Sequence, residues 1–304
     1  MKLSRLITVL MGGGAPKIIF TDDFSTDKDD WTGATWAVDA GAVANTPTLG
    51  STLVTNGTFG ADTNWGKPTG GTIEGGVAVF TNVAAFGAFT QSIGNRVNKY
   101  ILFQYDLLGF SSGTFSLGFT SKFSKVVAAN ATYKWGSLGV SDNSFLYLYA
   151  RAAGTTLNID NVSAQLATDA TLFYTIAPGY STGKVSADWT IPGNVPAGVV
   201  MCLDDAATPA NYVLAYHDGV NFVMVKYVAG VRTELIYTAV AYSAGAAVEI
   251  IRSPGTNTFR GYYNGSQVGV DQLVTDAGII NNKIHGLFSM DAENTCSEFL
   301  YQNF

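Results

Sequence analysis

Residues 212–227 read YVLAYHDGVNFVMVKY, and this stretch decides the fold class. Tyr212–His217 and Phe222–Tyr227 are rich in aromatic and aliphatic residues, and Asp218-Gly219 between them is a favoured hairpin turn. The pattern continues in Val231–Val240, Val248–Arg252, Phe259–Tyr263 and Gln267–Leu273, separated by the turn residues Ala229-Gly230, Ser253-Pro254-Gly255 and Asn264-Gly265. Short strands with turns at about 8–12-residue spacing predict antiparallel β-sandwiches or jelly rolls.

An upstream segment, Tyr100–Leu107, shows the alternation of a half-buried strand. Ile101, Phe103, Tyr105 and Leu107 share one face, while the other face carries Gln104 and Asp106. Helical periodicity is absent beyond the first ten residues. With 304 residues, the chain is long enough for two β domains, so we predict an all-β protein with two antiparallel sandwiches.

The composition excludes several classes of protein. Hydrophobic residues make up 47% of the chain and charged residues only 13%, which argues against a disordered chain. The net charge of −6 argues against nucleic-acid binding, because an acidic chain repels phosphates. No apolar run of about 18 residues occurs, so no membrane span is expected.

The two cysteines and two histidines give no sign of a metal or disulfide framework. Cys202 and Cys296 form either one pair or two buried free thiols, and we favour the free thiols. Cys202, Cys296, His217 and His285 are dispersed without zinc-ligand spacing. We therefore expect no required cofactor.

The N-terminus is predicted to be an anchoring arm, residues 1–17. Leu3, Leu6, Ile7 and Leu10 follow the i, i+3, i+4, i+7 spacing of a short amphipathic stripe, and Gly12-Gly13-Gly14 follows them as a hinge. The Ala-x-Ala pattern of a cleaved secretory signal is absent. Ten residues are too few for a stable isolated helix, so the stripe packs either on its own domain or on a partner protein.

Residues 50–167 carry a motif at each end. Leu53-Val54-Thr55-Asn56-Gly57-Thr58-Phe59 and Trp65 open the segment, and Leu157-Asn158-Ile159-Asp160-Asn161-Val162-Ser163 closes it. These two motifs resemble those of the family 4/9 carbohydrate-binding modules, which are jelly rolls. Similar segments are frequent in proteins of tailed bacteriophages. The resemblance implies a glycan-binding domain within 50–167.

The flanking segments, 18–49 and 168–304, resemble one sandwich split by that insertion. Thr21-Asp22-Asp23-Phe24, Trp31 and Trp36-Ala37-Val38 are similar to the opening of a concanavalin A-like (laminin G-like) sandwich. Tyr262-Tyr263-Asn264-Gly265 resembles its typical hairpin, and Phe299–Phe304 its closing strand, which the resemblance places beside the first strand. The alternative is a tandem order of a small N-terminal strand piece followed by two sandwiches.

Catalytic and metal-binding patterns are sparse. None of the five glutamates, Glu74, Glu234, Glu249, Glu293 and Glu298, begins the Glu-x-Asp-x-x-Glu pattern of concanavalin A-like glycosidases, so we predict no enzyme, although distant aspartates can still converge. The resemblance implies a structural Ca²⁺ held by Asp160 with Glu74 as a partner; the alternative is that Asp160 caps a turn. The acidic run of Asp22, Asp23, Asp27, Asp29 and Asp30 is interpreted as a solvated loop, with a calcium site as the alternative.

The strongest binding candidate is Phe145-Leu146-Tyr147-Leu148-Tyr149-Ala150-Arg151. On a strand, Phe145, Tyr147, Tyr149 and Arg151 share one face, and the aliphatic residues share the other. We predict that the aromatic face is a flat platform on which sugars stack, with Trp135, Tyr133 and Gln104 as weaker contributors. The alternative is that the rings are buried against a neighbouring domain or subunit.

The resemblance and the uncleaved N-terminal arm imply a non-enzymatic structural or adhesion protein of a bacteriophage virion, such as a fibre, adhesin or capsid decoration component. Its expected partners are other virion proteins through the arm, further copies of itself, as in a trimer, and a host-surface glycan. The first alternative is a secreted bacterial carbohydrate-binding protein. The second is a glycan depolymerase with unrecognised carboxylates.

Overall fold

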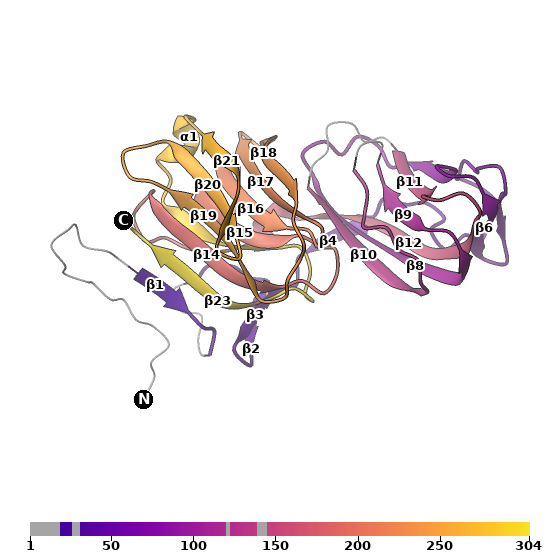
Figure 1. Cartoon of the computed structure of the whole chain (residues 1–304), viewed down its shortest axis with the longest axis horizontal. Coiled ribbons are helices and arrows are strands. Elements are labelled where there is room, and N and C mark those ends of the chain that lie inside the picture. The colour runs from indigo at the N-terminus through magenta and orange to yellow at the C-terminus, as the bar shows by residue number, and fades with distance from the viewer. Residues whose placement is uncertain (1–18, 26–30, 120–121, 139–144) are drawn as a thin grey trace. The chain divides into compact units, whose positions relative to one another are not determined.

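A computed structural model of the chain describes residues 19–25, 31–119, 122–138 and 145–304. It is built almost entirely of antiparallel strands, which confirms the predicted fold class (Figure 1). The chain divides into two compact units. Unit 2 is Leu49–Ala167, and unit 1 comprises Thr168–Phe304 with the described residues up to Thr48. Among the described residues, no helix has the length and apolarity needed to cross a membrane.

Unit 1 contains two sheets. The larger follows the order β2-β3-β23-β14-β19-β20-β21, with β1 also paired to β23. Its strands are β1 (Ile19–Asp22), β2 (Trp36–Asp39), β3 (Ala42–Asn45), β14 (Gly183–Thr190), β19 (Ala246–Arg252), β20 (Thr258–Tyr263), β21 (Ser266–Leu273) and β23 (Thr295–Gln302). The second sheet, of order β13-β22-β15-β16-β17-β18, contains β13 (Phe173–Ile176), β15 (Ala197–Leu203), β16 (Tyr212–His217), β17 (Asn221–Val228), β18 (Val231–Ala239) and β22 (Ile284–Ser289). Two short helices, η1 (Asp169–Thr171) and α1 (Ala277–Ile280), lie in connections.

One hydrophobic core joins the two sheets of unit 1. β14 directs Val185, Ala187 and Trp189 into it, and β15 contributes Val199 and Met201. The first strand pairs with the closing strand, since Phe20 lies opposite Tyr301, as the resemblance to concanavalin A-like sandwiches implies. Cys202 and Cys296 are buried free thiols, which confirms that prediction too.

The interpretation of Asp22 as part of a solvated loop is wrong. Asp22 is only 4% exposed, and its carboxylate accepts hydrogen bonds from the Phe24 amide (2.8 Å) and the Trp31 indole Nε1 (2.7 Å). A buried carboxylate requires such donors, so Asp22 holds Trp31 against the core. Asp27, Asp29 and Asp30 lie outside the described residues.

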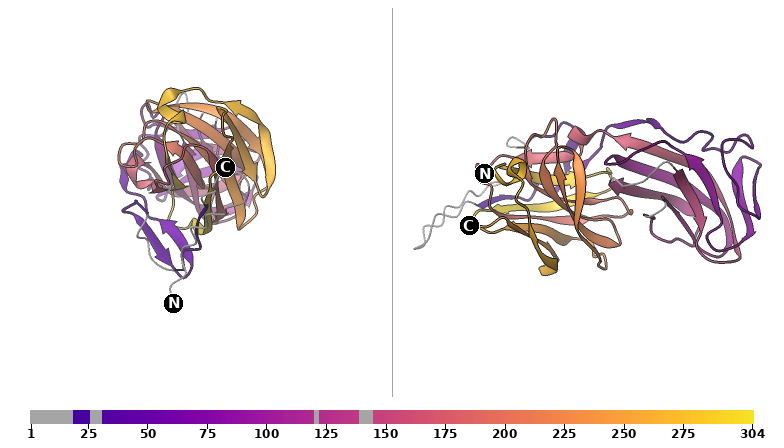
Figure 2. Two further views of the ribbon diagram at one scale, coloured as in Figure 1. Left: turned by 90° about the vertical axis from the view of Figure 1, so that its left-hand side faces the viewer. Right: turned by 90° about the horizontal axis from the view of Figure 1, so that it is seen from above.

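Unit 2 also contains two sheets (Figure 2). The larger has the order β10-β8-β12-β6-β5, with β4 on β12; it contains β4 (Leu49–Thr52), β5 (Gly71–Glu74), β6 (Val77–Val83), β8 (Tyr100–Ser112), β10 (Ala131–Leu138) and β12 (Thr155–Ala167). The smaller has the order β7-β11-β9, with β7 (Ala88–Ser92), β9 (Phe115–Gly118) and β11 (Phe145–Ala150). The predicted inward set of β8, Ile101, Phe103, Tyr105 and Leu107, is buried in the core between these sheets.

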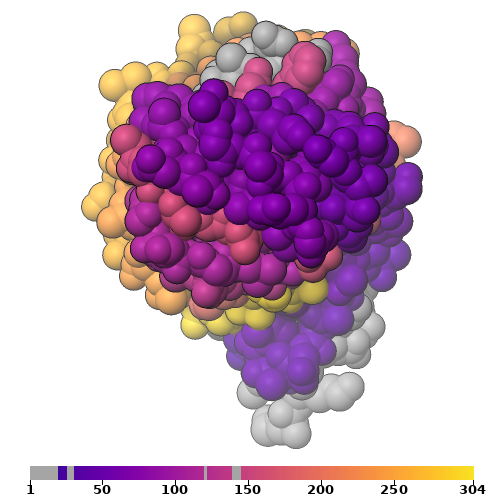
Figure 3. Space-filling model, turned by 90° about the vertical axis from the view of Figure 1, so that its right-hand side faces the viewer, coloured from indigo at the N-terminus to yellow at the C-terminus, as the bar shows by residue number. Residues whose placement is uncertain are grey.

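The entry and exit of unit 2 lie side by side. β4 and the end of β12 are antiparallel neighbours, with Leu49 opposite Ala167 and Thr52 opposite Gln165. In unit 1, the Thr168 amide donates a hydrogen bond to the Thr48 carbonyl at 2.9 Å. Unit 2 is thus inserted into unit 1 between Thr48 and Thr168, two residues that are hydrogen-bonded to each other. In Figure 3, which looks at one end of unit 2, its early residues (purple) and its later residues (pink) share one surface.

Candidate carbohydrate-binding site

The outer face of β11 carries the aromatic residues that the sequence singled out. Leu146, Leu148 and Ala150 are fully buried in the core of unit 2, so the other residues of the strand face away from it. Phe145 is 47% exposed, and Tyr147 and Tyr149 are half-buried. The predicted division of β11 into a core face and an outer aromatic face is therefore correct.

The rings on this face do not form a flat platform. Tyr147 and Tyr149 are stacked, with ring centroids 5.0 Å apart and planes at 15°. Coplanar rings cannot approach so closely, so the two rings stand face to face on the sheet and direct their edges and hydroxyls outward. Phe145 flanks Tyr147 with a centroid distance of 6.5 Å. The predicted platform is thus corrected to an upright row of rings.

Small neighbours leave room for this row. Tyr147 lies between Thr90 of β7 and Gly118 of β9. Gly118 is required locally, because a Cβ atom there would lie 2.4 Å from Cδ1 of Phe123. Phe123 occupies that space and packs edge-on against Tyr149, with centroids 5.1 Å apart.

Arg151 closes the row. Its guanidinium carbon lies 4.7 Å from the ring centroid of Phe123 and 5.7 Å from that of Phe86, both within cation–π range. The backbone fixes this arrangement: the Phe86 amide donates to the Ala150 carbonyl, and the Arg151 amide donates to the Thr114 carbonyl. We call Phe86, Phe123, Phe145, Tyr147, Tyr149 and Arg151 the aromatic ridge.

Sequence reasoning missed Phe86 and Phe123. Phe86 is 65% exposed and has a φ of 66°, in a turn between Ala85 and Gly87. A large aromatic residue within a turn of small residues is the one available signal, because such a ring has no core to enter. Phe123 gives no comparable signal, since it joins the ridge only through the pairing of its segment with β9.

The phenol of Tyr149 is protonated at neutral pH. Burial raises the pKa of Tyr149 above its usual value, and Tyr147 raises it further, while Arg151 opposes the shift. Within the described chain, neither the Tyr147 nor the Tyr149 hydroxyl hydrogen-bonds to another residue. Both hydroxyls can therefore donate to and accept from a ligand.

All three weaker candidates lie elsewhere, and their assignment to this surface is wrong. Trp135 is 5% exposed and stacks on Phe103 at 5.1 Å, so it belongs to the core of unit 2. Gln104 lies on β8, opposite Lys134, on the outer face of the larger sheet. Tyr133 stacks on buried Tyr105 from β10 of that same sheet. A strand's own sequence does not state which sheet it joins.

The calcium candidates Asp160 and Glu74 each accept a hydrogen bond from a residue close in sequence. The Asp160 carboxylate accepts the Asn161 amide at 2.7 Å, and Glu74 accepts the Thr72 hydroxyl at 3.3 Å. In the part of the chain that the structure describes, no group of three or more His, Cys, Asp or Glu side chains is placed to hold a metal ion. Calcium binding stays a prediction, and a melting temperature that falls on adding EDTA would test it.

Three carboxylates do converge in unit 1, although no sequence pattern joins them. On the outer face of the larger sheet, Asp188 lies opposite Glu298, and Glu249 lies opposite Ser186. Glu249 is held by Lys184 (2.5 Å) and the Ser186 hydroxyl (2.9 Å). Burial raises the pKa of Asp188, and the charges of Glu298 and Glu249 raise it further.

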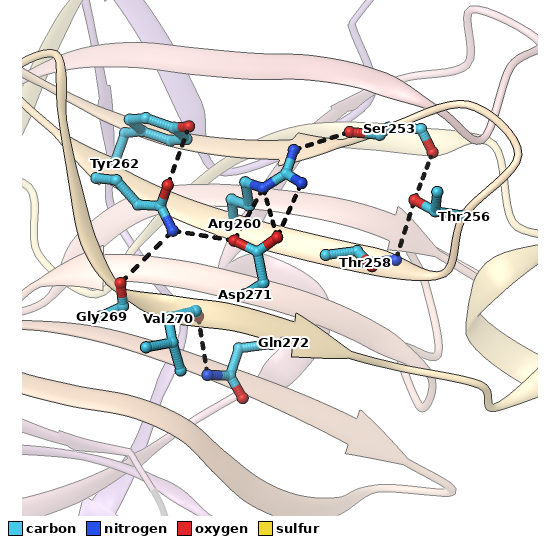
Figure 4. A network of polar contacts seen from close by, with 10 residues as sticks. Ser253, Thr256, Thr258, Arg260, Tyr262, Gly269, Val270, Asp271 and Gln272 are labelled. Atoms are coloured by element: carbon cyan, nitrogen blue, oxygen red, sulfur yellow. Dashed lines mark hydrogen bonds and ion pairs between the residues drawn. The ribbon is translucent and has the colours of Figure 1, made fainter.

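A second polar group on unit 1 stabilises an edge hairpin (Figure 4). Arg260 forms an ion pair with Asp271 at 2.8 Å across β20 and β21, and its Nη1 donates to the Ser253 hydroxyl. Gln267 donates to Asp271 and lies beside Tyr262. These groups satisfy one another on an exposed surface and offer no free cation or carboxylate.

Comparisons with known proteins add the following. No protein-family model matches the sequence, and no curated protein matches it. Among solved structures, a carbohydrate-binding module from Bacillus subtilis covers 46% of this chain and 83% of its own length at 15% identity and a TM-score of 0.30. The LG4-5 domains of mouse laminin alpha1 cover 79% and 89% at 10% identity and a TM-score of 0.26.

The kappa-carrageenase of Pseudoalteromonas carrageenovora covers 93% of this chain and 92% of its own length, at 9% identity and a TM-score of 0.30. At such identities and TM-scores, these similarities add nothing to what the sheets themselves show. The predicted anchoring residues Leu3, Leu6, Ile7 and Leu10 lie outside the described residues.

Proposed function

We propose that unit 2 binds carbohydrate through the aromatic ridge and that the chain is a non-enzymatic adhesion protein. The observation that carries the proposal is the ridge itself: exposed rings, free phenol hydroxyls and a guanidinium on one sheet face. Sugars present C–H surfaces that pack on aromatic rings and hydroxyls that hydrogen-bond to such polar groups. Aromatic rings that serve only to pack a core are buried, whereas a group of large exposed rings marks a binding surface.

The end rings are the best stacking positions. Each tyrosine uses one ring face on the other tyrosine, and Tyr149 also meets the edge of Phe123. Phe86 and Phe145, at 65% and 47% exposed, keep the most open surface. We therefore assign sugar stacking to these two phenylalanines and hydrogen bonding to the tyrosine hydroxyls.

The test is a glycan array and a thermal melt on the variant Phe86→Ala/Phe145→Ala. Each lost stacking contact is expected to cost about 1 kcal/mol, or about fivefold in affinity, while the melting temperature changes little. Tyr180→Ala, which removes an exposed aromatic residue of unit 1, is the matched control (40% exposed). Glycan binding that survives the double variant would overturn the proposal.

The proposed setting is a bacteriophage virion, with support from the resemblance of segments 53–59 and 157–163 to phage-borne modules. Residues 1–16 would attach the protein to another virion protein or to further copies, as in a trimer. Deleting residues 2–14 should leave both units folded and abolish incorporation into particles. Normal incorporation of the shortened protein would contradict the anchoring role, and a processed, soluble monomer would favour a secreted carbohydrate-binding protein.

A glycan depolymerase is the second candidate, favoured by one observation, the raised pKa of Asp188 beside Glu298. Glycoside hydrolysis needs one protonated and one ionised carboxyl group. We rank it lower because Glu249 is already committed to Lys184 and Ser186. Release of reducing ends from a polysaccharide, abolished by Asp188→Asn, would establish it.

A further inference from the structure

We propose that the ligand of the aromatic ridge is an acidic polysaccharide whose uronate carboxylate binds the Arg151 guanidinium. This inference rests on the proposed function and specifies its ligand class. It starts from the state of Arg151, whose guanidinium contacts two aromatic rings but, within the described residues, forms no ion pair and no side-chain hydrogen bond. The donors of the guanidinium fork are therefore available to an oxyanion.

The surroundings of Arg151 favour an anion. Strands β7, β9 and β11 contain no Asp or Glu, and neither does the segment 122–127, which pairs with β9. That segment instead carries Lys122 and the exposed Lys125. A negatively charged ligand thus meets no carboxylate on these three strands or on the segment 122–127.

The distribution of charge along the chain agrees with this polarity. Unit 2 contains seven Lys and Arg against five Asp and Glu, a net charge of +2, although the whole chain is at −6. Three of its described carboxylates, Glu74, Asp106 and Asp160, are on strands of the larger sheet, and the fourth, Asp62, is paired with Lys67 at 2.7 Å. The fifth, Asp142, is outside the described residues.

The geometry selects a planar anion close to a sugar ring. Phe86 and Phe123 hold the guanidinium in place, so little rotamer freedom is lost when it binds a ligand. A carboxylate matches the guanidinium fork in a bidentate pair, and the pyranose of the same residue can pack on the exposed Phe86. A uronic acid supplies both features in one sugar.

The experiment measures binding of the whole protein to oligogalacturonates and oligomannuronates, each beside its methyl ester, by calorimetry in low salt. The free acids should bind at least about tenfold more tightly than their esters, because a charge-assisted hydrogen bond is lost on esterification. Arg151→Met, which keeps the aliphatic stem, should remove that preference. Lys99→Met, an equal loss of charge at an exposed position of unit 2 outside β7, β9, β11 and the segment 122–127, should keep most of it.

Three outcomes separate the proposals. Preference for the acids that disappears with Arg151→Met supports the inference, and raising the NaCl concentration should weaken it. Equal binding of acids and esters that depends on Phe86 and Phe145 overturns the acidic ligand but leaves the proposed function standing. Absence of ridge-dependent binding to any acidic or neutral oligosaccharide of a glycan array overturns both.

Discussion

Two aromatic faces of this protein are built from similar sequence and have different fates. In unit 1, one face of the second sheet, of order β13-β22-β15-β16-β17-β18, points away from the core. This face carries Phe173, Tyr212, Tyr216, Tyr227 and Phe288, and none of them is more than 4% exposed. In unit 2, the ridge exposes 65% of Phe86 and 47% of Phe145. Alternation along a strand therefore identifies the residues that face away from the core, but not whether that face is covered.

The difference lies in the neighbours. In unit 1, Tyr212 stacks on Tyr227 at 4.6 Å and meets Phe173 edge-on at 5.3 Å, and every residue of β15 and β16 is buried. In unit 2, β11 has one strand on each side, and the residues opposite its tyrosines are Ala88, Thr90, Ser116 and Gly118. The rings of unit 1 are thus packed against other large rings, whereas small residues lie opposite the half-buried tyrosines of β11.

The largest expected effect comes from truncating one ring in each face. Phe288→Ala removes a fully buried ring of unit 1 and should lower the free energy of unfolding by about 3–5 kcal/mol, because the cavity cannot be refilled. Phe145→Ala in unit 2 should cost less than about 1 kcal/mol. Urea titrations of both variants measure this, and equal losses would show that the ridge is a packed face after all.

Lowering the pH should destabilise unit 1 and leave unit 2 largely unaffected, since both histidines lie in unit 1. His285 is fully buried, donates from Nε2 to the Tyr180 carbonyl (2.8 Å) and accepts the Cys202 amide at Nδ1 (3.2 Å), and its burial lowers the pKa to about 4. The unfolded chain, with a histidine pKa of about 6.5, then binds more protons. The stabilisation is complete above pH 6.5 and is lost as the pH falls towards 4, by at most about 3 kcal/mol.

Hydrogen exchange, corrected for the intrinsic rates at pH 7 and pH 4.5, reads the two units separately. Peptides from β15, β16 and β22 should lose protection on acidification, while peptides from β8 and β12 should keep it. A matching loss in unit 2 would assign the effect to something other than histidine.

These comparisons show what the sequence could and could not predict. The alternation in β8 and the Asp218-Gly219 hairpin depend only on local chemistry, and both are confirmed. The predicted range 50–167 differs by one residue from the compact unit Leu49–Ala167. Whether that segment folds alone stays a prediction. The ridge residues of β11 could be predicted, because that strand alternates. Phe86 and Phe123 could not, because backbone pairing between distant segments brings them to the ridge. Trp135 was misplaced for the same reason, since its sheet depends on the pairing of β10 with β8.

An intermediate effect is expected at the glycine beneath the ridge. Gly118→Ala places a Cβ 2.5 Å from the Lys122 carbonyl and 2.8 Å from Phe123 Cα, so the backbone of the paired segment must shift. Overpacking of this kind costs about 1–3 kcal/mol and should displace Phe123 from Tyr149 and Arg151. Gly60→Ala, which meets nothing within 4 Å in the same unit, is the control. Thermal melts that fail to distinguish the two variants would show that the ridge does not need this close approach.

The smallest expected effect separates the two roles assigned to the tyrosines. Tyr147→Phe and Tyr149→Phe keep the stacked pair, whose centroids are 5.0 Å apart, and remove hydroxyls that bond to no other described residue. Stability should therefore change by less than about 0.5 kcal/mol. Each variant should bind the ridge's ligand about threefold to tenfold more weakly, the net value of one hydrogen bond. Calorimetric titrations alongside a thermal melt measure both quantities. Full affinity in both variants would mean that the hydroxyls face solvent in the complex, which would leave recognition to the phenylalanine faces and Arg151 alone.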